Sequence, residues 1–303
     1  MFTRKRRRHR AHDDAIDAPW VGWALFAPAA LFLVTYTYYP AIATFVTSLF
    51  SDPKAGRASR FIGIENYRSM IDDPIFVKAL ANNAWYALGT IPLSIALAVL
   101  MALLVNRALP GRVLVRMAYF APTVLAMVAV ANIWLLIYSP QIGPLNALLS
   151  LFGRAPHNWL GQPDTALGSV IAVAIWKEAG FFMIFYLAAL QSLPLNLAEA
   201  AALEGASRWY FFWRVTFPLL MPTTLFVLVN AIVNAFRLVD HIIVMTKGGP
   251  DNASMLLLYY VYETGFRYWE TSYAAAMSMV LLVILGVVAI GQFLLLERRT
   301  HYR

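Results

Sequence analysis

Residues 84–105 read AWYALGTIPLSIALAVLMALLV, a run of 22 residues without a single charged side chain. A transmembrane helix needs about 20 predominantly apolar residues to cross the hydrocarbon core of a bilayer. This run has that length, and a helix that is apolar all round must be buried in lipid or in a large core. The stretch therefore predicts a membrane-spanning helix.

The composition of the whole chain extends this prediction. Of 303 residues, 60% are hydrophobic and 13% charged, and the mean hydropathy is +0.62. A soluble domain of this size cannot bury so much apolar surface, so we expect an all-α polytopic membrane protein with six transmembrane helices. The other five windows are Trp20–Tyr39 (continuing past Pro40 toward Phe50), Met117–Tyr138, Leu167–Leu190, Thr223–Met245 and Tyr273–Leu296.

Several kinds of chemistry are excluded by the residue content. Cysteine is absent, which excludes disulfides, thiolate catalysis, iron–sulfur clusters and cysteine-based zinc sites. The five histidines are scattered without metal-ligand spacing, so we expect no metal and no cofactor in this chain. The histidines are His9, His12, His157, His241 and His301.

The positive charge reports membrane topology. The net charge of +8 would suggest nucleic acid in a soluble protein, but in a membrane protein the excess lysine and arginine marks the cytoplasmic side. A basic cluster, residues 4–10, precedes the first span, and with it inside, 14 basic residues fall inside, 7 outside and 3 in or beside spans. We expect a multi-pass protein of the bacterial cell membrane with both termini cytoplasmic, no nucleic-acid partner, and three regions: a basic tail (1–19), a transmembrane domain (20–296) and a C-terminal tail (297–303).

The segment between spans four and five, about residues 191–222, has helical periodicity of its own, and we call it the elbow. Asn196 is a good N-cap, Glu199 sits where a capping box would place it, and Gly205 ends the helix. Ser207 can cap a second helix. Small side chains on the first helix let another protein approach closely, so the elbow is suited to a groove on a partner; they are Ala198, Ala200, Ala201 and Ala202.

The elbow also carries a family resemblance. Glu199-Ala200-Ala201, with Gly205 and Pro218 downstream, resembles the EAA loop of the membrane subunits of bacterial ATP-binding-cassette (ABC) importers. Other stretches are similar to the carbohydrate branch of that family, so the resemblance covers nearly the whole chain beyond residue 19. They are Phe61–Tyr67, Trp176–Phe181, Leu190–Pro194, Met245–Pro250 and Tyr273–Ala276.

This resemblance implies a non-catalytic permease with the type I importer fold and several partners. The elbow would dock on a cytoplasmic ATPase dimer that binds ATP and Mg²⁺, since the chain holds no GxxxxGK[ST] loop. A second homologous permease subunit and an extracytoplasmic solute-binding protein would complete the importer of a carbohydrate-class solute: a sugar, polyol, glycerol 3-phosphate or glycerophosphodiester. The implied coupling residues are Glu199, Ala200, Ala201, Glu204 and Gly205. Alternatively, Glu199 is a capping residue only.

Polar residues in span five are candidates for the solute pathway. Asn230, Asn234, Arg237 and His241 recur at spacings of four, three and four, and Asp240 follows Arg237 by three. This spacing favours either a stripe along the solute path or hydrogen bonding between helices with an internal Arg237–Asp240 pair.

Two charged neighbours in span four, Lys177 and Glu178, point about 100° apart, so at least one is expected to find a partner on another helix. A proton relay through Glu178 is the alternative.

Two other functional classes remain as hypotheses. A secondary, ion-coupled transporter would need an inverted repeat and an essential membrane carboxylate, and a membrane enzyme would need a clustered catalytic set; the sequence shows no clear sign of either.

Overall fold

The computed structural model describes residues 19–53, 58–106 and 111–299, and within these ranges its secondary structure is helices joined by turns and loops, with one isolated bridge between Phe50 and Phe61. Short π-helical turns occupy residues 34–38, 212–216 and 263–267. The α-helices are α2 (Pro19–Leu33), α3 (Tyr39–Ser48), α4 (Glu65–Asp72), α5 (Pro74–Asn106), α6 (Arg112–Val124), α7 (Met127–Ile137), α8 (Pro144–Leu151), α9 (Pro163–Ser192), α10 (Leu195–Leu203), α11 (Arg208–Phe211), α12 (Phe217–Leu219), α13 (Met221–Arg237), α14 (Asp240–Met245), α15 (Leu257–Tyr262) and α16 (Thr271–Arg299).

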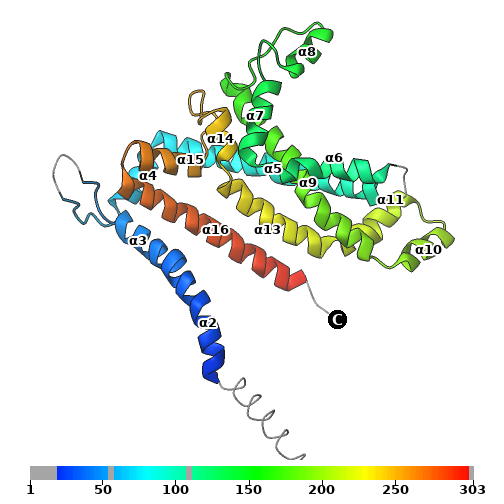
Figure 1. The fold of residues 1–303 in the computed structure, drawn as a ribbon, viewed down its shortest axis with the longest axis horizontal. Helices are drawn as coiled ribbons and strands as arrows, with labels where there is room; N and C mark the ends of the chain where they lie inside the picture. Colours follow the sequence, from blue (N-terminus) through cyan, green and yellow to red (C-terminus); the bar gives the residue numbers. More distant parts are fainter. Residues whose placement is uncertain (1–18, 54–57, 107–110, 300–303) are drawn as a thin grey trace, which may run out of the picture.

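The predicted fold class is confirmed. Among the described residues, five helical stretches are long and apolar enough to cross a membrane, and a bent pair makes a sixth. The five are Gly22–Ser48, Pro74–Asn106, Pro163–Ser192, Met221–Met245 and Thr271–Gln292. Helices α5, α9, α13 and α16 form the body of the molecule in Figure 1. The predicted basic tail falls almost entirely outside the described residues.

The third predicted span, Met117–Tyr138, is not one straight helix. It consists of α6 and α7, which meet at an angle of 106°. Leu125 has extended backbone angles, and Ala126 leaves the helix with it. Pro122, which lacks an N–H group to donate within the helix, lies in the last turn of α6 before this break. The hydropathy window correctly found enough apolar residues but carried no information about their direction.

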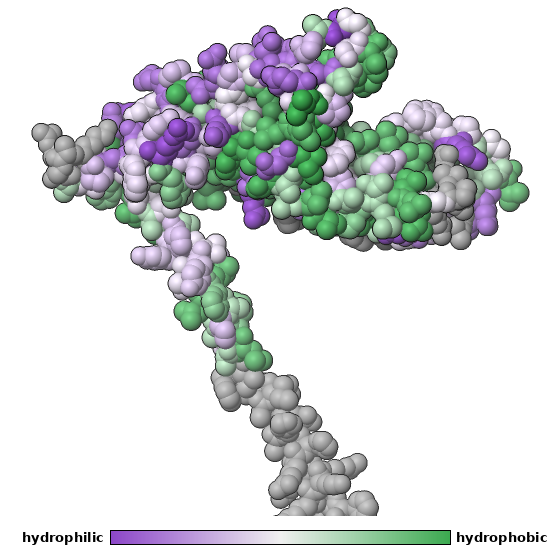
Figure 2. Space-filling view, turned by 45° about the horizontal axis from the view of Figure 1, so that its top comes forward, coloured by the Kyte–Doolittle hydropathy of each residue, from purple (hydrophilic) through white to green (hydrophobic). Residues whose placement is uncertain are grey.

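The elbow lies at one end of the body, and helices α4 and α15 lie at the other. In Figure 1, α10 and α11 occupy one end, whereas α4 and α15 occupy the other. Helices α2 and α3 extend away from the body, and no side chain in the most apolar window of this first span is buried. Figure 2 shows apolar surface across the body toward the elbow and on the part of this span farther from the body, with hydrophilic residues gathered at the α4–α15 end.

Polar side chains tie the helices together at the α4–α15 end. One carboxylate oxygen of Asp73 accepts from the backbone N–H of Ile75 at the start of α5, and the other accepts from the hydroxyls of Tyr260 (2.7 Å) and Tyr273 (2.8 Å). Burial, the hydrogen bond to Asp73 and the charge of that carboxylate raise the pKa of Tyr260, so its hydroxyl stays protonated and donates. Asp73 therefore joins α5, α15 and α16.

A second tie joins α5 to both α13 and α15. The side-chain amide of Asn83, on α5, donates to the carbonyl of Ala235 on α13, and its side-chain oxygen accepts from the backbone N–H of Leu257 on α15. Asn83 is 1% exposed. One buried amide thus satisfies backbone groups at the ends of two different helices, which fixes their positions relative to α5.

Candidate functional site

The first helix of the elbow, α10, begins earlier than its sequence suggests. Pro194 is the N-cap, and neither Asn196 nor any other side chain caps the helix by a hydrogen bond. The predicted Asn196 cap and Glu199 capping box are therefore wrong. Pro194 is already extended (ψ 128°), so the helix starts directly after it, and Asn196 and Glu199 each fall two positions too late to act as the N-cap and its capping-box partner.

The end of α10 agrees with its sequence. Gly205 has φ +73°, the left-handed conformation that glycine adopts without strain. Its N–H donates to the carbonyl of Ala202, and the N–H of Ala206 donates to that of Ala201, which is a Schellman motif. The predicted cap of the second helix is also present, because the Ser207 hydroxyl accepts from the N–H of Tyr210.

The predicted coupling residues lie together on the exposed elbow. Glu199, Ala200, Glu204 and Gly205 are exposed and Ala201 is half-buried. Within the described part of the chain, the Glu199 carboxylate makes no ion pair or side-chain hydrogen bond. Leu203, at the tip, is 91% exposed. An apolar side chain so exposed beside small residues and a carboxylate is typical of a surface that another protein covers.

A second candidate site is a cavity of about 210 Å³ where α5, α6, α9 and α13 meet. It lies next to both helix breaks, the one between α6 and α7 and the one after Arg237. Its lining residues are Tyr86, Thr123, Met127, Ala174, Lys177, Glu178, Phe181, Asn234 and Leu238.

Several buried polar atoms in and around this cavity lack a partner. Among the described residues, the second carboxylate oxygen of Glu178, the hydroxyl of Thr123 and Nδ1 of His241 make no hydrogen bond. Glu178 is 7% exposed. Tyr86 connects the cavity to His241, whose Nε2 lies 3.1 Å from the tyrosine hydroxyl. Buried polar groups are normally satisfied, so a cavity lined by unsatisfied ones is suited to a polar ligand or water.

The predicted polar stripe of span five is divided by the structure. α13 ends at Arg237 and α14 begins at Asp240, so the four residues do not share one face of a continuous helix. Asn234 lines the cavity, and Asn230 donates to a carbonyl of its own helix. Arg237 and Asp240 are exposed, and no ion pair joins them among the described residues, so the predicted internal pair is wrong.

His241 differs from the rest of the stripe because it is completely buried, with 0% of its surface exposed. The two residues between α13 and α14, Leu238 and Val239, are not helical, and they change the register of the chain and turn His241 toward Tyr86. Glycine or proline is absent from this break, so the sequence offered no local signal of it.

Lys177 has the interhelical partner that its position predicted. Its ammonium group donates to the carbonyls of Pro122 (3.2 Å) and Leu125, both on the α6 side of the third-span break. These carbonyls have lost their helical partners because the helix stops there. Lys177 therefore satisfies backbone groups that the bend exposes, and Glu178, its neighbour, faces the cavity.

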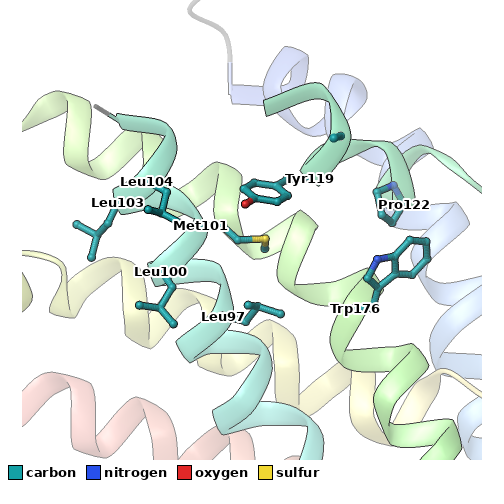
Figure 3. A pocket seen from close by; sticks show the side chains of 9 residues that line it. Leu97, Leu100, Met101, Leu103, Leu104, Tyr119, Pro122 and Trp176 are labelled. Atoms are coloured by element: carbon teal, nitrogen blue, oxygen red, sulfur yellow. The ribbon is translucent and has the colours of Figure 1, made fainter. Parts of the chain in front are cut away.

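The neighbouring pocket has a different character. It has a volume of about 550 Å³ and lies between α5, α6 and α9. Figure 3 shows its walls, which are aliphatic except for Tyr119 and Trp176. With so few polar groups it offers little to a hydroxylated or charged solute, which leaves the cavity of Glu178 and Asn234 as the polar candidate.

Comparison with known proteins gives concordant similarities. Residues 83–302 match the family of binding-protein-dependent transport system inner membrane components. The chain is 31% identical to the sn-glycerol-3-phosphate transport system permease protein UgpA of Agrobacterium fabrum over 281 residues, which is 92% of this chain and 96% of that protein. It is 32% identical to the lactose transport system permease protein LacF of Rhizobium radiobacter, with 90% and 92% of the two chains covered.

A solved structure is similar over nearly the full length. It is the crystal structure of a bacterial ABC transporter involved in the import of the acidic polysaccharide alginate, and one of its chains aligns with a TM-score of 0.84 at 26% identity. The alignment covers 96% of this chain and 99% of that chain. The helix order, including the elbow, is thus shared with a chain of known structure.

Proposed function

The chain belongs to the family of binding-protein-dependent transport system inner membrane components and is a permease subunit of a carbohydrate-type ABC importer; from this premise, we propose that it forms half of a solute pathway and couples to a separate ATPase through the elbow. It is a multi-pass inner membrane protein. We propose that both termini and the elbow face the cytoplasm, which the distribution of basic residues supports.

The observation that carries the coupling proposal is the exposure of the elbow. Glu199 has no partner within the described chain, Leu203 is nearly fully exposed, and α10 ends in a rigid glycine turn. The sequence has no phosphate-binding loop, so ATP and Mg²⁺ would be bound by a cytoplasmic ATPase dimer. ATP binding would draw two elbows together and favour the outward-open state, because the elbow is bound differently in the two states.

A second homologous permease subunit would supply the other half of the pathway and the other elbow, as the family resemblance implies. Delivery of solute would fall to an extracytoplasmic solute-binding protein, and membership of a family of binding-protein-dependent transport components supports this partner. ATP hydrolysis would then release the solute inward.

The polar cavity is the proposed place of solute contact in this subunit. Glu178 and Asn234 offer hydrogen-bond acceptors and donors to hydroxyl groups, and Thr123 adds a free hydroxyl. We propose a carbohydrate-class solute: a sugar, a polyol, glycerol 3-phosphate or a glycerophosphodiester. The exposed Arg237 at the end of α13 is available for a phosphate, which agrees with the similarity to a glycerol-3-phosphate permease.

The test is co-purification and ATPase activity of the complex with Glu199→Lys, measured with candidate solute-binding proteins loaded with solute. The matched control is Glu65→Lys, an exposed glutamate on α4 at the opposite end of the body. We expect Glu199→Lys to abolish ATPase association or stimulated hydrolysis and Glu65→Lys to leave both intact. Transport that persists without any associated ATPase would refute the importer and favour the secondary, ion-coupled transporter.

A further inference from the structure

A large groove lies between the body and the elbow, and we call it the elbow groove. Its volume is about 1150 Å³. One wall is the half of α5 nearest the elbow, represented by Val99 and Leu103, and the facing wall is formed by Phe212, Phe217 and Leu219. Most of its lining is aliphatic or aromatic, so it offers a hydrocarbon-like surface in a part of the chain that lies within or beside the membrane.

The rim of the elbow groove is different from its walls. Arg208 lines the groove, and none of the described residues that line it is acidic. The guanidinium group of Arg214 lies 5.8 Å from the centre of the Tyr210 ring. Neither arginine has an ion-pair partner among the described residues. Arg208 is thus a cationic group in an apolar groove without a carboxylate to neutralise it, whereas Arg214 does not line the groove.

Tryptophan side chains place this rim at the membrane–water boundary. Trp209 is 70% exposed and Trp213 47% exposed, and both line the groove. Exposed tryptophans beside basic residues are typical of the headgroup level of a bilayer, where the indole ring is half in hydrocarbon and half in water. The groove therefore combines apolar walls, exposed tryptophans and one unpaired arginine, which suit the acyl chains, the interfacial region and the phosphate of a phospholipid.

We propose that the elbow groove binds an anionic membrane phospholipid, with acyl chains along α5 and the phosphate held by Arg208. Basic pockets beside membrane helices bind anionic headgroups by the same charge complementarity. The lipid would touch the body through Val99 and the elbow through Phe212, so it would act as a removable spacer between them. Its effect on coupling rests on the proposed function, whereas its binding does not.

The binding test uses the complete importer purified from nanodiscs of phosphatidylcholine with phosphatidylglycerol, followed by native mass spectrometry to count retained lipids. We expect the wild type to retain phosphatidylglycerol in preference to phosphatidylcholine, and Arg208→Gln to weaken that preference by about fivefold. The matched control is Arg154→Gln, an exposed arginine near α8, which should change nothing. Equal retention of the two lipids by the wild type would overturn the proposal.

A second measurement separates a lipid from a protein in the groove. Ala96 is an exposed lining residue on α5, and replacing it with the photoreactive residue p-benzoylphenylalanine places a crosslinker inside. We expect a phospholipid adduct on this chain, with anionic lipid preferred. A crosslink to an ATPase or to a second permease subunit would overturn the proposal and identify the groove as a subunit interface.

The same groove can be blocked without touching the arginines. Ala96→Trp fills part of it, and Leu88→Trp, on an exposed position of α5 outside the groove, is the control. We expect Ala96→Trp to lose retained phosphatidylglycerol and Leu88→Trp to keep it. If lipid retention falls while ATPase activity is unchanged, lipid binding stands and its link to coupling fails, which keeps the two claims distinguishable.

Discussion

Replacing Lys177 with methionine would remove the group that satisfies the bend of the third span. The ammonium donates to two backbone carbonyls, those of Pro122 and Leu125, which the helix break has left without partners. A hydrogen bond from a charged donor contributes about 1.5–3 kcal/mol, and the lower figure applies because Lys177 is half-exposed. The loss is therefore about 3 kcal/mol for the two bonds. Methionine keeps the apolar stem, so most packing is retained.

The assay is thermal unfolding of the purified complex. At about 2 °C per kcal/mol for a chain of this size, Lys177→Met should lower Tm by roughly 6 °C. Lys78→Met is the comparison, because Lys78 donates to a single carbonyl, that of Asp251, at the α4–α15 end, and it should lower Tm by half as much or less.

Two results would refute this reasoning. One is an unchanged Tm for Lys177→Met, which would mean that the carbonyls at the bend find other donors at no cost. The other is restoration of Tm when Glu178→Gln is added to Lys177→Met, which would mean that the lysine acts by balancing the Glu178 charge rather than by binding the backbone.

Four further substitutions test a close contact between helices, the glycine turn of the elbow, and the hydrogen bonds of Asp73 with Tyr260. Gly180→Ala should destabilise the protein by about 1–3 kcal/mol, because the added Cβ would lie 2.3 Å from a backbone oxygen of α6. Gly168→Ala on the same helix is the control, because its Cβ would meet nothing within 4 Å. Thermal unfolding should distinguish the two variants. Gly205→Ala should lower the free energy of unfolding by about 1 kcal/mol, because alanine is strained at this left-handed turn. The Tm should therefore fall only slightly, whereas stimulation of the ATPase should be clearly reduced. Asp73→Asn should accelerate hydrogen exchange of α15, and unchanged protection would contradict the tie. The raised pKa of Tyr260 makes its contribution to stability complete below pH 10.0 and lost as pH rises further, so Tyr260→Phe should remove that alkaline loss.

The membrane fold was predictable because the length and polarity of a span are local properties of the sequence. Bends were not predictable in the same way. Pro92 lies inside α5 without ending that helix, whereas α6 stops two residues after Pro122. What differs is a donor from elsewhere in the chain: Lys177 supplies hydrogen bonds to the carbonyls beside Pro122. A proline therefore marks a place where a helix can stop, and at Pro122 a distant side chain satisfies the carbonyls that the stop exposes.

The functional residues divide along the same line. The elbow is formed by residues that are close together in the sequence, so its glycine turn and its Ser207 cap could be predicted from their spacing. The cavity is assembled from four helices, and its members, such as Thr123 and Tyr86, carry no motif. His241 was misplaced because a two-residue break without glycine or proline altered the helical register.

The bond from Lys177 to the bend bears on how the chain enters the membrane during synthesis. An isolated α9 would carry Lys177 and Glu178 into hydrocarbon, at a cost of about 2.5–3.5 kcal/mol for a charged residue at mid-helix. The carbonyls that receive Lys177 belong to residues 122 and 125, which are synthesised more than 50 residues earlier. The acceptor has therefore already been synthesised when α9 leaves the ribosome, so a helix that carries two adjacent charged residues can insert against an existing partner.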